Sequence, residues 1–288
     1  MNTSDISTAA PKANEAFRRA VYDGQIYLLP ATDISRRLIA DVLQLIEAEL
    51  GQEGPVREAQ FRLTGDELFR RIGRLRKVLY EETRFLQAMR DIVGEYGFDA
   101  RRNAFDPLRL RVSTHRGFDN PKAAPIYYAH RDTWYSHPAC QISWWIPLHD
   151  LPPEQTFVFF PDFLRQAVEN NSGDFDYDTW TRDKKSLRIG WQDPNAGTTS
   201  LYPGFHGTMG DARRVPFSCR AGEILVFAGA HLHQTVKNET GMTRFSVDFR
   251  TADVEDFRAG IGAPNVDNRS TGSALRDYFP PLAYPHSS

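Results

Sequence analysis

The chain changes character at Pro107, and this change is the strongest constraint on its fold. Before Pro107, apolar residues recur at helical spacing in two long stretches. After it, short runs of β-branched and aromatic residues are separated by Pro, Asp and Gly, which is typical of strands joined by turns. About eight such runs lie between residues 107 and 252. The pattern predicts a mostly β protein: a double-stranded β-helix (jelly roll, cupin-like) core buttressed by N-terminal helices.

We expect a single domain with several parts. Residues 1–20 are polar and predict a flexible tail, and residues 21–106 predict a helical N-terminal support. Residues 107–252 form the predicted jelly-roll core, and residues 253–288 form a C-terminal extension. Within the core, residues 162–210 lose periodicity but keep Trp and Tyr, so we expect an insertion that forms a lid over a substrate pocket.

Capping residues mark the starts of the two predicted helices. Thr32 or Asp33 precedes the first apolar stripe as its N-cap. The sequence from Thr64 to Glu67 fits a capping box, and the apolar stripe that follows continues to Gly94. We therefore predict one helix after each cap, both packing on the core by their apolar stripes.

Charge and cysteine content limit the class of protein. The net charge of -2 gives no support to nucleic-acid binding. No apolar run is long enough to cross a bilayer, and the N-terminus lacks the apolar segment of a secretory signal. Only two cysteines occur, Cys140 and Cys219, so we expect a cytoplasmic protein without a disulfide framework or a membrane partner. Any metal in it would have N and O ligands.

The segment HRDTWYSHP suggests a metal site. His130 and Asp132 stand two apart, but in a chain with 8 histidines such a pair also arises by chance. A partner exists in His233, which is followed after a turn at NETG by Arg244 and Ser246. Alternate residues of a strand share a face, so this cation and hydroxyl would lie together near a metal-binding histidine. There they could hold a carboxylate.

In this order and spacing, these residues resemble the signature of Fe(II)/2-oxoglutarate-dependent dioxygenases. The nearer resemblance is to the phytanoyl-CoA-hydroxylase-like branch, in which a W-I-P-L-x-D strand follows His-x-Asp, as residues 145–150 do here. Residues 221–250 are similar to that branch's C-terminal core strands, and the resemblance covers roughly residues 107–252. Residues 152–164 depart from the Asn-Gly turn that the family usually shows, which affects the substrate contacts and not the metal site.

The resemblance implies a non-heme iron oxygenase. His130, Asp132 and His233 would hold Fe(II), and Arg244 and Ser246 would bind the distal carboxylate of the co-substrate 2-oxoglutarate, with O2 at the remaining position. The reaction implied is hydroxylation of an unactivated C–H bond of a small molecule, with release of succinate and CO2. Halogenating relatives carry a small residue in place of the carboxylate, so Asp132 favours hydroxylation or a related oxidation.

Several neighbours are candidates for secondary roles. Gln141, Ser143 and Trp145 share one face of a predicted strand and would line the pocket, while Trp144 points into the core. Gln141, Trp145 and Tyr128 are candidate co-substrate contacts. Within the insertion, the predicted apolar walls are Phe175, Tyr177, Trp180, Trp191 and Tyr202, and the predicted polar anchors are Arg182, Arg188 and His206.

Alternatives remain open at three places. His231 competes with His233 as the distal metal ligand, and Arg250 competes with Arg244 as the carboxylate clamp. Arg109 and Arg111 also share a strand face, for which a solvated surface is the commoner explanation.

Two other functional classes compete with the oxygenase. One is a catalytically inactive jelly-roll metal-binding or sensor protein, and the other is a zinc-dependent hydrolase that uses the same three ligands. The carboxylate clamp favours the oxygenase, because a zinc hydrolase has no use for it. The mixture of charged and aromatic residues in the insertion predicts a small polar or amphipathic substrate.

Overall fold

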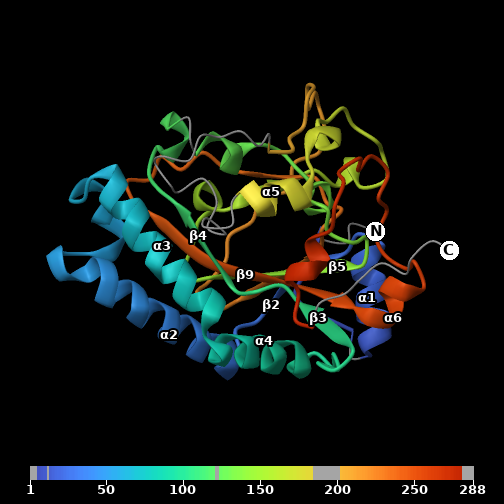
Figure 1. Cartoon of the computed structure of the whole chain (residues 1–288), viewed down its shortest axis with the longest axis horizontal. Helices are drawn as coiled ribbons and strands as arrows, with labels where there is room; N and C mark the ends of the chain where they lie inside the picture. The colour runs from blue at the N-terminus through green and yellow to red at the C-terminus, as the bar shows by residue number, and fades with distance from the viewer. Residues whose placement is uncertain (1–4, 12, 121–122, 184–201, 281–288) are drawn as a thin grey trace.

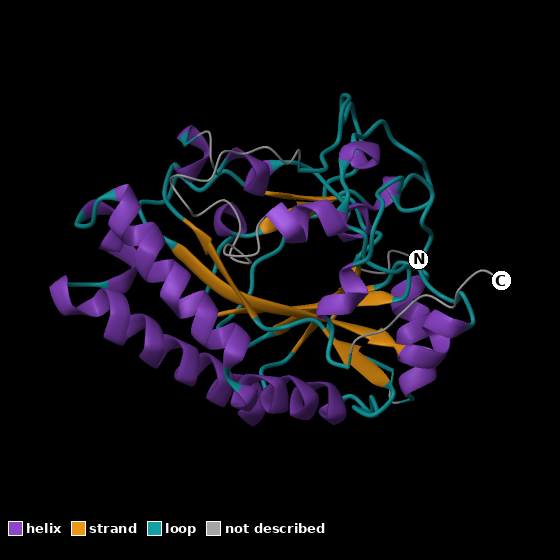
Figure 2. Cartoon of the chain, viewed as in Figure 1, coloured by secondary structure: helices purple, strands orange, loops and turns teal. Residues whose placement is uncertain are grey.

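A computed structural model describes residues 5–11, 13–120, 123–183 and 202–280. Its centre is a large sheet whose one face is covered by helices α2 (Asp33–Leu50), α3 (Gly65–Glu81) and α4 (Thr83–Glu95) (Figure 1). A small sheet, helix α5 (Tyr177–Asp183) and long connections lie over the other face (Figure 2). The main apolar core fills the space between the three helices and the large sheet.

The large sheet has seven strands in the order β1-β2-β7-β5-β9-β3, with β4 also paired to β9. All of its pairings are antiparallel except that of β1 with β2. The small sheet is the antiparallel pair β6 and β8. The strands are β1 (Ile6–Ser7), β2 (Ile26–Leu29), β3 (Asn103–Phe105), β4 (Arg109–Ser113), β5 (Gln141–Pro147), β6 (Phe157–Phe159), β7 (Ile224–Ala228), β8 (His233–Thr235) and β9 (Arg244–Asp253). The remaining helices are α1 (Asn14–Tyr22) and α6 (Val254–Arg258).

Alternation along the central strands separates the core from the functional face. In β9, Phe245, Val247 and Phe249 belong to the main apolar core. The residues between them project to the opposite face, as period-2 geometry requires. In β5, Trp144 is fully buried in that core, as predicted, and its indole donates to Thr251 Oγ1. The polar residues of both strands therefore face the layer that contains the small sheet.

The described residues form two facing sheets with no continuous hydrogen-bonded ladder around them, so the structure does not show the predicted jelly roll as a closed β-helix. A second apolar cluster holds the sheets together, with Trp145 and Phe227 from the large sheet and Phe157 and Phe159 from the small one. No described strand of one sheet pairs with a strand of the other, and Phe159 of the small sheet forms an isolated bridge with Val215, which lies outside both sheets. The described architecture is a set of helices on one face of a large mixed sheet, with a second, small sheet opposite.

Two of the expected strands in residues 107–252 are not strands. Residues 126–132 run from the end of one 3-10 helix (Ala124–Tyr127) to the start of the next (Asp132–Tyr135), with His130 in an isolated bridge between them. Residues 214–219 make only isolated bridges, at Val215 and Cys219. Pro125 and Pro216 lack the N–H that a continuous ladder needs, which the alternating apolar pattern does not reveal.

The N-terminal part is more ordered than the sequence predicts. The flexible-tail prediction for residues 1–20 is wrong from Asn14 onwards, where α1 buries Phe17 completely. Arg18 is also buried and donates to Asp256 at 2.6 Å. A segment that is polar on average still forms a helix when one apolar residue per turn meets the core.

Both predicted helix starts are confirmed, and the second helix is divided. Thr32 and Ser35 form a capping box at α2, and Thr64 accepts a hydrogen bond from the Glu67 N–H at α3. The single predicted helix breaks at Glu82, which is extended (φ -80, ψ 119), so α3 and α4 are separate. Buried positions keep helical spacing on both sides of the break, which is why one stripe was expected.

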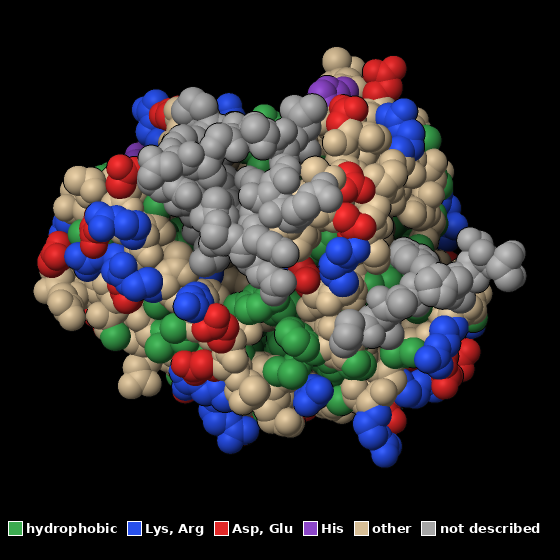
Figure 3. All heavy atoms as spheres, in the orientation of Figure 1, with side chains coloured by type: hydrophobic (Ala, Val, Ile, Leu, Met, Phe, Trp, Pro, Cys, Tyr) green, Lys and Arg blue, Asp and Glu red, His purple; other side chains and the backbone are tan. Residues whose placement is uncertain are grey.

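Lys and Arg are interspersed with Asp and Glu on the face that Figure 3 shows. Within the described ranges, no helix is both long and apolar enough to span a bilayer. Cys140 and Cys219 are buried and free.

Candidate metal centre and cavity

His130 and His233 are brought together by backbone pairing. Each N–H donates to the other's carbonyl at 3.0 Å, across an isolated antiparallel bridge. Asp132 begins the short 3-10 helix that follows His130 and turns its carboxylate back towards both imidazoles. One ligand atom from each of the three residues lies within 4.8 Å of the other two. In the described part of the chain, no other group of three such residues meets this criterion.

Backbone acceptors fix the tautomer of both histidines. His130 Nδ1 lies 2.9 Å from the carbonyl of Tyr128, and His233 Nδ1 lies 3.0 Å from the carbonyl of His231. A carbonyl oxygen can only accept, so each Nδ1 carries the proton and each Nε2 keeps its lone pair. Burial lowers the pKa of His130 to about 3 and also lowers the pKa of His233, so both rings are neutral.

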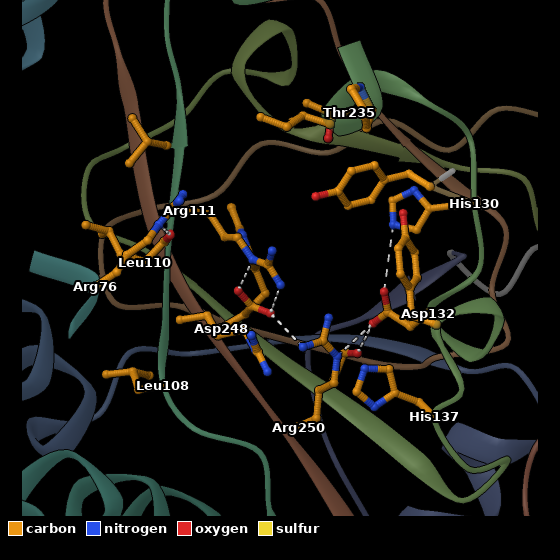
Figure 4. A pocket seen from close by; sticks show the side chains of 18 of the residues that line it. Arg76, Leu108, Leu110, Arg111, His130, Asp132, His137, Thr235, Asp248 and Arg250 are labelled. Carbon is orange, nitrogen blue, oxygen red and sulfur yellow. Dashed lines mark hydrogen bonds and ion pairs between the residues drawn. The ribbon is translucent and has the colours of Figure 1, made fainter. Parts of the chain in front are cut away.

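Asp132 offers one oxygen to a metal and uses the other for support. Its Oδ2 accepts from Ser143 Oγ (2.8 Å), Gln141 Nε2 (3.1 Å) and Arg250 Nε (3.3 Å). Its Oδ1 faces His130 Nε2 at 3.8 Å (Figure 4). Burial opposes ionisation, but the charge of the neighbouring Arg250 outweighs it and holds the pKa of Asp132 well below its usual range. Asp132 therefore keeps one carboxylate oxygen, Oδ1, available for a metal ion.

Two neutral imidazole nitrogens and one carboxylate oxygen on one side of a site suit an octahedral ion with three positions left open. That donor set fits Fe(II). Each of the three side chains is also held in its orientation by hydrogen bonds to neighbouring protein groups. The aromatic rings around His233 are Phe157 and Phe227, with centroids 5.6 and 5.5 Å from the imidazole. They shield the site from water on that side.

Arg244 is a buried cation in the same cavity. It opens β9, its exposed fraction is 4%, and no acidic side chain among the described residues forms an ion pair with it. Its Nε has no hydrogen-bond partner among the residues that the structure describes, and its Nη1 lies 3.5 Å from the carbonyls of Gln155 and Thr156. Burial lowers its pKa to about 10, so it remains charged at neutral pH. A buried cation of this kind suits an anionic ligand.

Arg250, the alternative clamp, is engaged by three carboxylates. It lies 2.8 Å from Asp106, 3.3 Å from Asp132 and 3.7 Å from Asp248. These acids outweigh the effect of burial and raise the pKa of Arg250 well above its usual value. Its contacts give it a supporting position behind Asp132.

We expect Arg250→Met to destabilise the folded protein by about 3–5 kcal/mol, because it leaves three buried carboxylates without their shared cation. Urea unfolding followed by circular dichroism measures this change. Arg258→Met, at an exposed position of α6, is the matched control and should change stability by less than about 0.5 kcal/mol. Equal stability of the two variants would contradict the supporting role.

The other predicted contacts mostly act from behind the cavity wall. Gln141 is fully buried and bonds Asp132, and Ser246 Oγ accepts from Trp145 Nε1 at 3.0 Å. Trp145 itself lines the cavity, as predicted. Tyr128 is 43% exposed, and its contribution is the carbonyl that orients His130. Gln141, Ser246 and Tyr128 thus do not line the cavity in the structure.

His231, the alternative ligand, is directed elsewhere. It is fully buried and packs edge-on against Phe159 at 5.6 Å between ring centroids. It does not line the cavity that contains the other three ligands. Only its carbonyl serves the site, through His233 Nδ1.

The cavity has a volume of about 560 Å³ and extends from the three ligands to a wall that the sequence did not reveal. Arg109 and Arg111 were expected on a solvated face, but both line it. Arg109 pairs with Asp106 at 2.7 Å, and Arg111 forms two bonds with Asp248. Asp248 also lines the cavity, although the sequence pattern did not single it out. It lies on the same face of β9 as Arg244 and Arg250.

Part of the insertion also lines the cavity. Four of the five predicted aromatic walls are found there: Phe175, Tyr177, Trp180 and Tyr202. His206 is exposed and is not among the lining residues. Trp191, Arg188 and the side chain of Arg182 lie outside what the structure describes, so the lid remains a prediction.

Buried neutral histidines make stability depend on pH. Burial lowers the pKa of His130, His137 and His231 to about 3 and of His149 to about 4. The unfolded chain binds these protons near pH 6.5 and the folded chain does not, so stability falls as the pH drops below 6.5.

We expect the metal-free protein to lose about 1–2 kcal/mol of unfolding free energy per buried histidine between pH 7 and pH 5. Denaturant unfolding at the two pH values measures this loss. His206→Gln, at an exposed position, should leave the pH dependence unchanged. Equal unfolding free energies at pH 5 and pH 7 would contradict the burial of neutral imidazoles.

No protein-family model and no curated protein matches the sequence. Among solved structures, a non-heme monooxygenase, ThoJ in its apo form, is similar with a TM-score of 0.43 and 12% identity, over 82% of this chain and 76% of that one. EctD from S. alaskensis with bound Fe gives 0.41 and 14%, over 92% and 82%. The epimerase SnoN in complex with Fe3+, alpha ketoglutarate and nogalamycin RO gives 0.38 and 16%, over 82% and 81%. These similarities are remote, so we base the functional proposal on the site itself.

Proposed function

We propose that the protein is an Fe(II)- and 2-oxoglutarate-dependent oxygenase. One observation carries the proposal: a two-histidine, one-carboxylate centre shares its cavity with Arg244, a buried cation to which no described acid is paired. A metal site alone fits several functions. A metal site and a carboxylate receptor in one cavity fit a co-substrate that binds to both.

His130, Asp132 and His233 would hold the iron through two Nε2 atoms and Oδ1. The Arg244 guanidinium would bind the distal carboxylate of 2-oxoglutarate, and Trp145, fixed by its bond to Ser246, would form a wall beside it. When bound, Fe(II) with 2-oxoglutarate and O2 supplies an oxidant strong enough to hydroxylate an unactivated C–H bond, with release of succinate and CO2.

The protein's own residues would position the reactants and exclude water. Gln141, Ser143 and Arg250 keep Asp132 ionised and oriented, so that its free oxygen stays available. The aromatic residues of the cavity limit access to the centre. We propose that the substrate is a small polar or amphipathic molecule, and that the two facing sheets are the halves of a double-stranded β-helix. The two free cysteines support a cytoplasmic location.

Equilibrium binding tests the proposed pairing of metal and co-substrate. In the absence of O2, metal-free protein is titrated with 2-oxoglutarate by calorimetry, with and without one equivalent of Fe(II). We expect 1:1 binding that is at least about tenfold tighter with Fe(II), because the chelate adds metal bonds to the Arg244 contact. No binding of 2-oxoglutarate in the presence of Fe(II) would overturn the proposal.

A further inference from the structure

We propose that the substrate is an uncharged molecule with adjacent hydroxyl groups, and that these hydroxyls bind to the ion pair of Arg111 and Asp248. This inference rests on the proposed function and deepens it by naming the substrate class. The pair lines the same cavity as the three candidate metal ligands. Figure 4 shows Arg111 and Asp248 on one side of that cavity and His130 and Asp132 on the other.

The antiparallel pairing of β4 with β9 brings Arg111 and Asp248 together. Arg111 lies directly opposite Ser246, so Asp248, two residues further along β9, is its diagonal neighbour on the same face. Arg111 Nε donates to Asp248 Oδ1 at 2.5 Å, and Nη2 donates to Oδ2 at 3.0 Å. Two parallel bonds fix the plane of both groups. The side chain of Arg111 is 41% exposed and that of Asp248 9%, so the guanidinium is the more accessible partner.

The ion pair keeps hydrogen-bonding capacity for a ligand. Two of the five N–H groups of Arg111 bond to Asp248, and no described residue accepts a hydrogen bond from the other three. Each carboxylate oxygen of Asp248 can accept a second hydrogen bond. A hydroxyl group can accept from the guanidinium and donate to the carboxylate at the same time. Two adjacent hydroxyls can therefore bond to both partners without separating them.

The local pairing of charges favours an uncharged ligand at this position. An anionic ligand at Arg111 would meet the carboxylate of Asp248, and a cationic ligand at Asp248 would meet the guanidinium of Arg111. Hydroxyl groups avoid both repulsions and leave the ion pair intact, so no buried charge loses its partner. The connected ion pairs join three arginines to three carboxylates, namely Arg109, Arg111 and Arg250 to Asp106, Asp132 and Asp248.

The same network connects the ion pair to the candidate metal centre. Asp248 Oδ2 lies 3.7 Å from Arg250 Nη1, and Arg250 Nε lies 3.3 Å from Asp132 Oδ2. The dashed lines in Figure 4 follow this connection across the cavity. A substrate that lies along it can bind to the ion pair by its hydroxyl groups and place a C–H bond at its other end near the metal.

Aromatic side chains line the cavity and suit the apolar body of such a molecule. Tyr135 packs edge-on against His130, with 5.5 Å between ring centroids. Phe175 lies 5.4 Å from Tyr135, and Trp180 lies 6.3 Å from Phe175. This series of rings begins beside a candidate metal ligand and continues along the cavity wall. We therefore expect a substrate that combines an apolar body with a hydroxylated end.

Matched probe molecules test the inference without knowledge of the natural substrate. The diol 3-phenoxypropane-1,2-diol is compared with 3-phenoxypropan-1-ol, with the anion 3-phenoxypropanoate and with the cation of 3-phenoxypropan-1-amine. Each is titrated anaerobically by calorimetry into protein saturated with Fe(II) and 2-oxoglutarate. We expect the diol to bind about fivefold or more tightly than the single alcohol, and more tightly than either ion, because its second hydroxyl adds a hydrogen bond to a charged group. Equal affinity of the two alcohols, tighter binding of either ion, or no binding of the diol would overturn the inference.

Variants locate the preference at the ion pair. Arg111→Gln should remove most of the advantage of the diol over the single alcohol, and Arg111→Lys should retain a smaller advantage, because lysine lacks the planar set of donors. Arg101→Gln makes the same change in an exposed pair, in which Arg101 forms two bonds with Asp99, and should keep the full advantage. Thermal unfolding checks that each variant is folded, and if Arg111→Gln is not, Arg111→Lys decides instead. A full diol advantage in a folded Arg111 variant would overturn the assignment.

The same samples separate this inference from the proposed function. Affinity for 2-oxoglutarate should be unchanged in Arg111→Gln, because Arg244 is assigned to that ligand. If 2-oxoglutarate binds with Fe(II) but the diol shows no advantage, only the substrate class is wrong. If 2-oxoglutarate itself does not bind, the proposed function fails, and the four probes titrated into ligand-free protein still decide the hydroxyl site by the same comparison.

Discussion

Replacing Asp132 by alanine is expected to abolish Fe(II)-dependent turnover of 2-oxoglutarate and to weaken Fe(II) binding by a factor on the order of 100 or more. The substitution removes the one anionic donor of the centre, and two neutral imidazoles do not hold a divalent ion at that site against water. Fe(II) affinity is measured by anaerobic titration, and turnover by the formation of succinate.

The fold of this variant must be checked, because Asp132 also supports Arg250. Circular dichroism and thermal unfolding report whether the chain remains folded. Asp162→Ala makes the same chemical change at the start of the insertion, where Asp162 contacts Arg213, and should leave both metal binding and turnover unchanged. A folded Asp132→Ala protein with full activity would remove Asp132 from the metal centre.

Replacing Arg244 should weaken the binding of 2-oxoglutarate without lowering the stability of the ligand-free protein. Arg244→Met is expected to weaken 2-oxoglutarate binding by about 2–5 kcal/mol, or roughly 30-fold or more, because the distal carboxylate loses a buried charged partner. The same change should leave the thermal stability of the ligand-free protein equal or higher, since a buried cation without an acidic partner costs folding free energy.

Arg244→Lys separates charge from geometry. Lysine keeps the charge but cannot form two parallel bonds with a carboxylate, so its 2-oxoglutarate affinity should lie between those of the wild type and Arg244→Met. Arg213→Lys, at an exposed site, serves as the control. If 2-oxoglutarate affinity were unchanged in Arg244→Met, the carboxylate receptor would have to be sought elsewhere in the cavity.

The order of elements could be predicted from local sequence, but the closure of the sheets could not. Caps at Thr32 and Thr64 and the alternation in residues 141–147 and 244–250 depend on neighbours a few residues away. The break at Glu82 and the docking of Phe17 depend on surfaces formed by distant parts of the chain. Periodicity shows which side of an element is apolar, and it does not show where the chain must turn to cover a curved sheet.

The site shows the same division. The three candidate metal ligands could be predicted from their spacing, their order and the family resemblance, and the structure brings His130, Asp132 and His233 within reach of one ion. The position of Arg109 and Arg111 in the cavity was missed because both look like solvated charges, and only the approach of α3 over β4 turns their face into a cavity wall. Long-range packing therefore decided what the local pattern left ambiguous.

The most direct measurement of the central claim is succinate formation from 2-oxoglutarate by purified protein. The reaction contains Fe(II), ascorbate and O2, and it is compared with reactions that lack Fe(II), that lack O2, or that contain Asp132→Ala protein. The account predicts succinate and CO2 in equal amounts in the complete reaction and none above background in the others. Fe(II)-reconstituted, folded protein that binds 2-oxoglutarate but forms no succinate, with or without a panel of small polar or amphipathic candidate substrates, would contradict it.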